Sequence, residues 1–261
     1  MTCSSFSLMS DPTKRFSNRV GNYIKYRPDY SGAIIDLLTE ECGLTQQSII
    51  ADIGSGTGIL SELFLKNGNR VFGIEPNAPM RGAGEKLLER YSKFISINGA
   101  AEATTLSDHS VDFVVAGQSF HWFDQKLTRD EFSRILKPSG WVALVWNERR
   151  IDSTPLLRAY EQMLLKFGTD YQEVRHERVY QDVESFFSPR EFKLRTFDNR
   201  QCFDFQGVKG RLLSSSYVPA PGHEDFEAML EELRNIFEEY QKAGEVVFEY
   251  DTRVYFGQLK N

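Results

Sequence analysis

The sequence predicts an α/β fold with a mostly parallel β-sheet and helices on both of its faces. In the first half of the chain, short apolar runs alternate with amphipathic segments, which is typical of parallel strands joined by crossover helices. The first of these runs ends in a cluster of glycines, and the 261 residues suffice for one large domain with an insertion. Two late strand-like segments around a long helix would add an antiparallel edge.

The elements follow in order from their apolar spacing. Asp29 is a candidate cap for a first helix, which Gly43 would end. The expected strands lie at 48–53, 70–74, 94–97, 111–116, 141–146, 192–205 and 246–256, and the expected further helices at 59–66, 80–91, 124–136, 154–167, 179–187 and 223–243. The apolar run at 111–116, which only Asp112 interrupts, indicates a strand buried on both faces. Residues 137–140 (Lys-Pro-Ser-Gly) are expected to form a turn.

Composition argues against several classes of protein. The net charge of −6 and the lack of a basic stripe disfavour a nucleic-acid binder. Three separated cysteines without a C-x-x-C disfavour a disulfide framework or a zinc site, and no other metal-ligand spacing occurs. No apolar run reaches the length of a membrane span or the form of a signal peptide. We therefore expect a soluble, cytoplasmic protein that is a monomer or a homodimer.

The sharpest motif is the segment Asp52-Ile53-Gly54-Ser55-Gly56-Thr57-Gly58, between the first expected strand and a helix. Glycines at alternate positions let the backbone turn tightly and let a ligand approach it closely. Loop amides near a helix N-terminus, at the carboxyl ends of the strands, are where open α/β sheets bind ligands. A dinucleotide loop, G-x-G-x-x-G, would need glycine where Ile59 stands, and the Gly-Lys-Ser/Thr of a phosphate loop does not follow.

A carboxylate follows the second expected strand. Glu75 comes directly after the run 71–74, Val-Phe-Gly-Ile. An acid at this position can accept hydrogen bonds from the hydroxyl groups of a ribose. The glycine loop and Glu75 together therefore predict a nucleoside site.

On these residues the chain resembles the class I S-adenosylmethionine-dependent methyltransferases. It resembles more closely their small-molecule branch, which includes trans-aconitate methyltransferase-like proteins (methyltransferase type 11). The matching stretches are 51–58, 73–77 with Met80, 99–102, 110–114, 118–123 and 134–140, preceded by the lead at 23–28. The resemblance implies S-adenosylmethionine as cofactor. It also implies a Rossmann-like, seven-stranded, mostly parallel sheet with one antiparallel strand and a helical insertion after strand five.

We expect one methyltransferase domain in four parts. A helical N-terminal arm would cover 1–48, and the cofactor-binding core would cover 49–150. A helical cover at 151–190 would follow. The C-terminal strands and the long helix at 191–261 would complete the sheet.

The resemblance implies a role for individual residues. The expected cofactor-binding set is Tyr23, Arg27, Asp52, Gly54, Ser55, Gly56, Gly58, Glu75, Pro76, Met80, Ala101, Glu102, Gln118, Phe120 and Trp122. Within it, Asp52 would support the glycine loop and help to hold the methionine moiety. Glu75 would accept the ribose hydroxyls, and Gln118 would lie near the sulfonium.

The remaining members of the set would surround the nucleoside and the sulfonium. By the same resemblance, Pro76 and Met80 would flank the adenine, and residues 101–102 would contact its edge. The rings of Phe120 and Trp122 either wall the cofactor pocket, where they could offer a π-face to the sulfonium, or pack in the core.

Methyl transfer from a sulfonium is an in-line displacement, so the protein mainly aligns the reacting groups and excludes water. An ionised carboxylate acceptor would require no base, whereas a phenol, an amine or a carbon acid would. His121, just past the fourth expected strand, is the candidate base, and its alternative role is to order its loop by hydrogen bonding.

Further charged and aromatic residues are candidates around the substrates. Tyr23 and Arg27 either close over the methionine carboxylate, for which a guanidinium is well suited, or belong to a solvated arm. Tyr217, Arg149 and Arg150 either face an anionic acceptor or have a structural role.

Three other functions compete with a small-molecule methyltransferase. A nucleic-acid methyltransferase is disfavoured because residues 117–120 lack the Asn/Asp-Pro-Pro-aromatic pattern of amino-base methylating enzymes. A catalytically silent S-adenosylmethionine-binding protein is compatible with the sequence. An NAD-dependent oxidoreductase is disfavoured by the glycine spacing.

Overall fold

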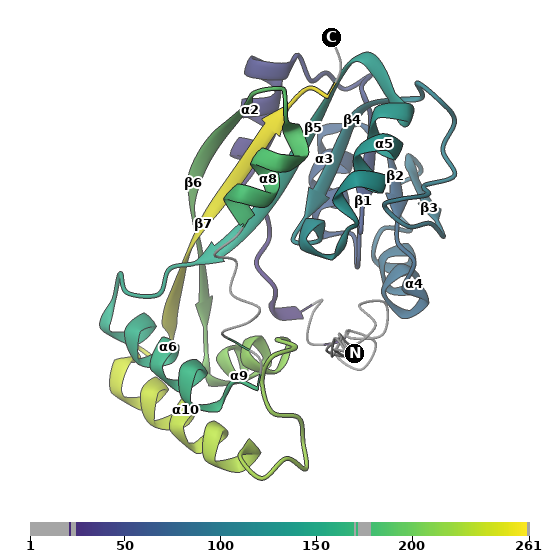
Figure 1. Ribbon diagram of the computed structural model, residues 1–261. Helices are drawn as coiled ribbons and strands as arrows, with labels where there is room; N and C mark the ends of the chain where they lie inside the picture. Colours follow the sequence, from purple (N-terminus) through teal and green to yellow (C-terminus); the bar gives the residue numbers. More distant parts are fainter. Residues whose placement is uncertain (1–20, 22–24, 170, 172–178, 260–261) are drawn as a thin grey trace, which may run out of the picture.

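The computed structural model describes residues 21, 25–169, 171 and 179–259. It contains a seven-stranded sheet in the order β3-β2-β1-β4-β5-β7-β6 (Figure 1). The strands are β1 (Ile49–Ile53), β2 (Arg70–Ile74), β3 (Phe94–Ile97), β4 (Val111–Gly117), β5 (Leu136–Arg149), β6 (Phe192–Phe203) and β7 (Val246–Gly257). Pairing is parallel from β3 to β5, whereas β7 runs antiparallel to both β5 and β6. The predicted Rossmann-like sheet with one antiparallel strand is confirmed.

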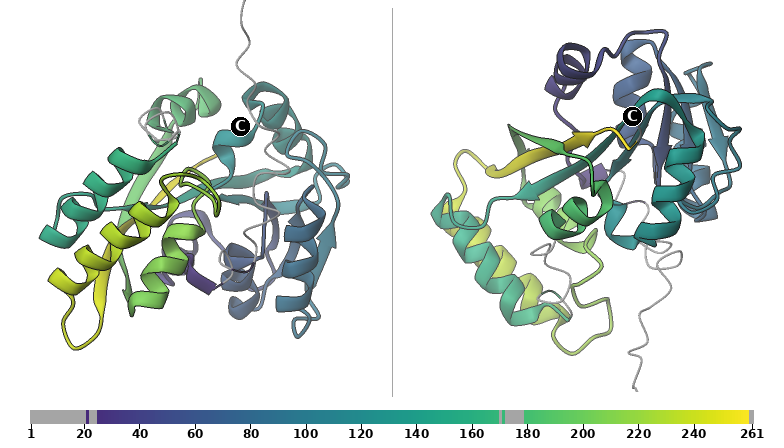
Figure 2. Two further views of the ribbon diagram at one scale, coloured as in Figure 1. Left: turned by 90° about the horizontal axis from the view of Figure 1, so that it is seen from below. Right: turned by 45° about the horizontal axis from the view of Figure 1, so that its top comes forward.

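Helices cover both faces because the strands alternate their apolar side chains. In β4, Phe113 and Val115 face one side, against α2 (Ala33–Cys42) and α3 (Ile59–Asn67). Val114 and Ala116 belong to the core on the other side, which α5 (Gln125–Ile135) and α8 (Val179–Phe187) cover (Figure 2). A strand covered on both faces needs consecutive apolar residues, as β4 has from Phe113 to Ala116. The helix α4 (Ala78–Leu87) connects β2 to β3.

The last two strands extend beyond the rest of the sheet. β6 and β7 pair from Phe192 and Gly257 as far as Phe203 and Val246, whereas the pairing of β5 with β7 ends at Arg149 and Tyr250. Three helices gather on this extension, namely α6 (Pro155–Phe167), α9 (Phe205–Leu213) and α10 (Phe226–Tyr240) (Figure 1). Their apolar faces form a second core with the end of the two strands. The insertion after β5 is helical, as predicted: α6 packs on this extension, whereas α8 packs on the core of the parallel sheet.

Two local features differ from the prediction. The expected turn at 137–140 lies within β5, which pairs with β4 at Leu136 and again from Trp141. The pairing register shifts between these two points, and a Cβ on Gly140 would lie 2.7 Å from Leu136 Cδ2. The strand expected at 192–205 ends at Phe203, because Asp204 caps the unpredicted helix α9.

The second core generates a stability prediction. Phe248 is fully buried, and its ring meets those of Tyr160 and Phe203 edge-on, with centroids 4.9 and 5.6 Å away. We expect Phe248→Ala to lower the free energy of unfolding by about 3–5 kcal/mol in urea denaturation. Val247→Ala changes the next residue, which is 42% exposed, and should cost less than about 1 kcal/mol. Equal losses for the two variants would show that the extension does not depend on this core.

Candidate functional site

The glycine-rich turn leaves β1 and enters α3 through three left-handed residues. Gly54, Gly56 and Gly58 have φ angles of 66°, 57° and 87°, a region that residues with a Cβ rarely adopt. A Cβ on Gly54 or Gly58 would also lie within 2.7 Å of a neighbouring side chain. The amides of Gly54 and Ser55 donate to the carbonyl of Ile74, at distances of 2.8 and 3.1 Å. The loop is therefore tied to the end of β2, and glycine is required where it turns.

Glu75 is bound to the same loop through its side chain. Oε2 accepts a hydrogen bond from the Gly56 amide at 2.9 Å, and Oε1 accepts one from the Asn77 amide at 2.8 Å. The residue is 8% exposed. Burial raises the pKa of Glu75, although the two amide hydrogen bonds oppose that shift. A carboxylate oxygen can accept more than one hydrogen bond, so each oxygen retains capacity for a further donor.

Asp52 lies directly beneath the loop, at the end of β1. It is fully buried, and its Oδ2 accepts a hydrogen bond from Ser61 Oγ at 2.6 Å. Within the described part of the chain, Oδ1 has no hydrogen-bond partner. Burial raises the pKa of Asp52 to about 7, in spite of the hydrogen bonds from Ser61. Within the described residues, one oxygen of this buried carboxyl group therefore has a hydrogen-bond partner and the other has none.

A cavity of about 250 Å³ opens at the carboxyl ends of the parallel strands. Its lining comes from the segments that follow β1, β2, β3 and β4. It consists of Gly54, Gly56, Glu75, Pro76, Asn77, Met80, Ala100, Ala101, Glu102, Gly117, Gln118, Ser119, Trp122 and Phe123. This position is the usual ligand site of open α/β sheets. We call this space the loop cavity.

Many of the residues expected to bind the cofactor line the loop cavity. These are Gly54, Gly56, Glu75, Pro76, Met80, Ala101, Glu102, Gln118 and Trp122. Asp52 and Gly58 are buried and do not line it, and Ser55 does not line it either. Tyr23 lies outside the described residues.

Phe120 and His121 lie outside the loop cavity. Phe120, in a short 3-10 helix, is 2% exposed and packs edge-on against Phe186, with ring centroids 4.9 Å apart. It belongs to the core under α8, and Phe123 lines the cavity instead. His121 is exposed, lies against the ring of Trp122 and is not part of the cavity lining. Its role as a base stays a prediction.

Sequence reasoning missed several lining residues. Asn77 caps α4, because its Oδ1 accepts a hydrogen bond from the Met80 amide at 3.0 Å. The helix therefore begins at Ala78, and the segment Asn-Ala-Pro at 77–79 was the available signal. Ser119 donates to the carbonyl of Ile53 at 2.8 Å and closes the cavity beside the glycine loop. Its sequence neighbourhood carries no comparable signal.

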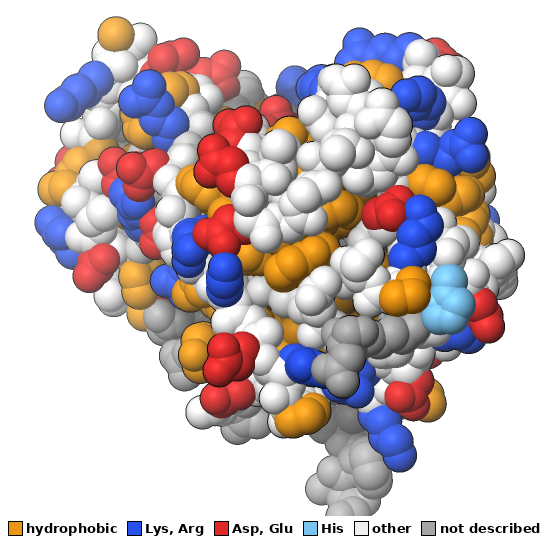
Figure 3. Space-filling model, turned by 90° about the horizontal axis from the view of Figure 1, so that it is seen from above, with side chains coloured by type: hydrophobic (Ala, Val, Ile, Leu, Met, Phe, Trp, Pro, Cys, Tyr) orange, Lys and Arg blue, Asp and Glu red, His pale blue; other side chains and the backbone are white. Residues whose placement is uncertain are grey.

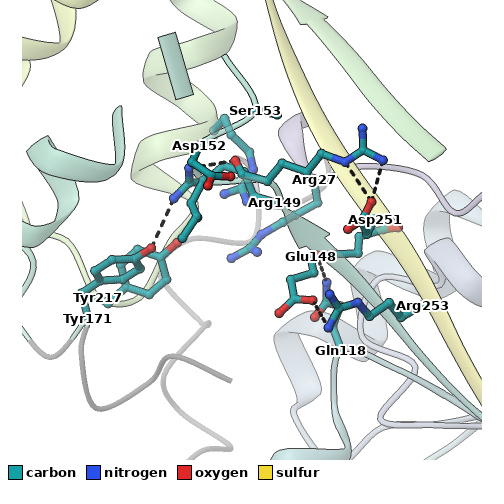
Figure 4. Close-up of a pocket in the computed structure, with 14 residues that line it drawn as sticks. Arg27, Gln118, Glu148, Arg149, Asp152, Ser153, Tyr171, Tyr217, Asp251 and Arg253 are labelled. Atoms are coloured by element: carbon teal, nitrogen blue, oxygen red, sulfur yellow. Dashed lines mark hydrogen bonds and ion pairs between the residues drawn. The ribbon is translucent and has the colours of Figure 1, made fainter. Parts of the chain in front are cut away.

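A second cavity, of about 530 Å³, lies between the end of β5, the neighbouring part of β7 and α9 (Figure 4). We call it the arginine cavity, because its lining includes Arg27, Arg149, Arg150, Arg211 and Arg253. Tyr171 and Tyr217 also line it. The sequence candidates Arg149, Arg150 and Tyr217 therefore lie together in this cavity. Arg27 lies in this cavity and not in the loop cavity, with its guanidinium donating to the Ser214 carbonyl at 3.1 Å.

Gln118 lines both cavities. Its φ of 57° is unusual for a residue with a side chain. Two hydrogen bonds hold this conformation, one from the backbone and one from the side chain. The Gln118 amide donates to the Val145 carbonyl at 2.9 Å, and Nε2 donates to the Asn147 carbonyl at 2.8 Å. Strain of this kind persists where the surroundings impose it, commonly at functional sites. Gln118 therefore marks the junction of the two spaces.

Two other kinds of feature are missing from the part of the chain that the structure describes. No three His, Cys, Asp or Glu side chains there are grouped in a way that could hold a metal ion. No helix there combines the length and the apolar character that a membrane crossing needs.

Comparison with known proteins indicates the class of enzyme that the chain resembles. Residues 51–144 match the methyltransferase domain family. An uncharacterized methyltransferase-like protein of Schizosaccharomyces pombe is 27% identical over 249 residues, which cover 93% of this chain and 94% of that one. An uncharacterized methyltransferase of Mycobacterium tuberculosis is 33% identical over 149 residues, covering 57% of each chain. A solved structure from Anaeromyxobacter dehalogenans, a proposed type II methyltransferase, shares the fold with a TM-score of 0.69 at 21% identity, covering 90% of this chain and 99% of that one.

Residues 51–144 carry the methyltransferase domain of the class I S-adenosylmethionine-dependent methyltransferases. The domain match spans β1 to β5 and therefore includes the glycine loop, Glu75 and Gln118. None of the relatives described above is named for trans-aconitate, so that finer branch stays a prediction.

The burial of Asp52 predicts a pH dependence of stability. Its pKa is raised in the folded state, so the folded protein binds more protons than the unfolded chain between about pH 4 and pH 7. Stability from this group is therefore present at low pH and is lost as the pH rises through about 7. We expect the unfolding free energy of the ligand-free wild type, relative to Asp52→Asn, to fall by roughly 2–3 kcal/mol between pH 5 and pH 8.

The measurement is urea denaturation of both proteins across that pH range. The Asn variant keeps the size of the side chain and removes the titration. A constant difference between the two proteins would contradict a raised pKa at this position.

Proposed function

We propose that this methyltransferase transfers the methyl group of S-adenosylmethionine to a small molecule, with the donor in the loop cavity and the acceptor in the arginine cavity. The observation that carries the proposal is the junction of the two cavities at Gln118. One space offers bare backbone and a carboxylate, which suit a nucleoside. The adjoining space is larger and is lined by charged and phenolic side chains.

The residues of the loop cavity fit the cofactor. Each oxygen of Glu75 accepts one backbone amide and can accept one ribose hydroxyl in addition. Gly54 and Gly56 present backbone without side chains, so a ligand can approach closely. Met80 and Pro76 supply apolar contacts for the adenine.

The protein's part in the reaction is alignment and exclusion of water. When bound, S-adenosylmethionine supplies an electrophilic methyl group, and the acceptor's lone pair bonds to the methyl carbon while the carbon–sulfur bond breaks and its electrons stay on sulfur. Gln118 is fixed by two hydrogen bonds to backbone carbonyls and lines both cavities. An acceptor that is ionised at neutral pH, such as a carboxylate, would need no proton transfer.

The charge pattern on one face of the molecule favours a small molecule as acceptor. On the face of the molecule in Figure 3, acidic and basic side chains are interspersed and do not gather in a basic stripe. A nucleic-acid partner would favour such a stripe.

The direct test is incubation of the purified chain with methyl-labelled S-adenosylmethionine and a small-molecule extract. We expect label to enter a small-molecule product that mass spectrometry can identify. Binding of S-adenosylhomocysteine without transfer to any component of extracts from several sources would favour a catalytically silent binding protein.

The assignment of Glu75 yields a binding prediction. We expect Glu75→Ala to weaken S-adenosylhomocysteine binding by about 1–3 kcal/mol in isothermal titration calorimetry, because ribose hydroxyls lose their acceptor in a closed site. Glu85→Ala is the matched control, since Glu85 lies on α4 with its side chain 52% exposed. The affinity of that control should equal that of the wild type.

An analogue without the ribose hydroxyls sharpens the test. It should bind the wild type less tightly than S-adenosylhomocysteine does, and the Glu75→Ala variant should discriminate less between the two ligands. Equal discrimination by both proteins would contradict contact between Glu75 and the ribose.

A further inference from the structure

Most of the positive charge in the arginine cavity is already neutralised. Three of its arginines form ion pairs with acidic side chains. The pairs are Arg149–Glu161, Arg150–Asp251 and Arg253–Glu148, with N–O distances of 2.5, 2.7 and 2.6 Å. A ligand therefore gains little from these three guanidiniums, whose charges are matched before it arrives.

Arg211 differs from these three arginines in the charge of its partners. It lies in the last turn of α9 and is 7% exposed. Its Nε donates to the Tyr250 hydroxyl at 3.3 Å and its Nη1 donates to Ser215 Oγ at 3.1 Å, so both of these partners are neutral. Among the described residues, no carboxylate lies within 4.0 Å of the Arg211 guanidinium, whereas each of the three pairs above meets that limit.

A buried guanidinium without a counter-ion is unfavourable, and the surroundings of Arg211 offer only partial compensation. The carboxyl end of α9 contributes a partial negative charge of about half an electron at most. Arg211 also lines a cavity, so a ligand can reach it. An oxyanion entering this cavity would supply the missing charge and a planar or tetrahedral set of acceptors for the guanidinium.

The phenol of Tyr217 lies in the positive potential of the same guanidinium. Burial alone would raise the pKa of Tyr217, yet the guanidiniums of Arg211 and Arg27, a hydrogen bond from Ser215 and the guanidinium of Arg149 together outweigh it, and the net shift is downward. Arg211 is the largest of these opposing influences. The Tyr217 end of the cavity is therefore electropositive and favours an anion.

This end lies away from the methyl donor. Figure 4 shows Tyr171 and Tyr217 on one side of the cavity and Gln118, with Arg253, on the opposite side. Gln118 is the residue shared with the loop cavity. An acceptor spanning the arginine cavity would consequently have its reacting atom at the Gln118 end and a second group at the Arg211 end.

We propose that Arg211 binds an oxyanion of the methyl acceptor, a carboxylate or a phosphate, that is not itself the methylated group. This inference rests on the proposed function of the two cavities. It names the acceptor as a bifunctional organic acid, with one anionic group that anchors the molecule and a separate nucleophilic atom. Methylation of the anchoring carboxylate itself would remove its charge and leave Arg211 without a counter-ion in the product complex.

The chemical groups of the product test the inference. After reaction with methyl-labelled S-adenosylmethionine and a small-molecule extract, the labelled product should contain an unmethylated carboxylate or phosphate group, which mass spectrometry can identify. A labelled product with neither group would overturn the inference while leaving the proposed function intact. Failure of all transfer would instead count against the proposed function on which the inference rests.

The kinetics of Arg211 variants provide a second test. With the product's precursor as substrate, Arg211→Gln should raise KM or lower kcat/KM by about 30-fold or more, the usual effect of removing one partner from a buried charge pair. Its affinity for S-adenosylhomocysteine should be unchanged. The matched control is Arg90→Gln, because the side chain of Arg90 is 65% exposed and lies outside both cavities.

A third variant separates a binding role from a structural one. Arg211→Met replaces an unmatched buried charge by an apolar chain, so its melting temperature without acceptor should not fall below that of the wild type by more than a few degrees. A large loss of stability together with unchanged kcat/KM would show that Arg211 only supports the fold, and would overturn the inference.

The same assay distinguishes the two oxyanions. Phosphatase treatment of the extract before the reaction should abolish the labelled product if the anchor is a phosphate ester, and should leave it unchanged if the anchor is a carboxylate. Either result is compatible with the inference, provided that the product contains the unmethylated group and depends on Arg211.

Discussion

The carboxylate of Glu75 connects the parts of this site that must stay together. One oxygen accepts the amide of Gly56 in the glycine loop, and the other accepts the amide of Asn77, which caps α4. A single buried side chain thus joins the segments that follow β1 and β2. Burial of a carboxylate is unfavourable by itself, and the two amides offset that cost. The left-handed glycines make the approach of the loop to this carboxylate possible.

The extension of β6 and β7 provides the second half of the proposed site. These strands pair beyond the end of β5 and support a helical unit with its own core. Because α9 belongs to that unit, Arg211 is brought opposite the end of the sheet where Gln118 lies. The sheet positions the donor cavity, and the helical unit contributes the charge that we propose selects the acceptor.

Much of the fold and of the loop cavity was predictable, because local sequence determines both. Alternating apolar runs indicated the strands, and Gly54 and Gly56 could be recognised from their spacing alone. The arginine cavity was harder to foresee. Its ion pairs join residues far apart in the sequence, such as Arg150 and Asp251, and neither local spacing nor composition reports such contacts. Phe120 shows the same limit, since only the placement of α8 makes it a core residue.

A crystal structure of the chain with S-adenosylhomocysteine tests the central claim most directly. The account predicts that the nucleoside occupies the loop cavity, with the ribose hydroxyl oxygens within about 3.2 Å of the two Glu75 oxygens and the methionine sulfur facing Gln118. A ligand bound elsewhere, or a ribose whose hydroxyls contact other groups while Glu75 keeps only its two amides, would contradict it.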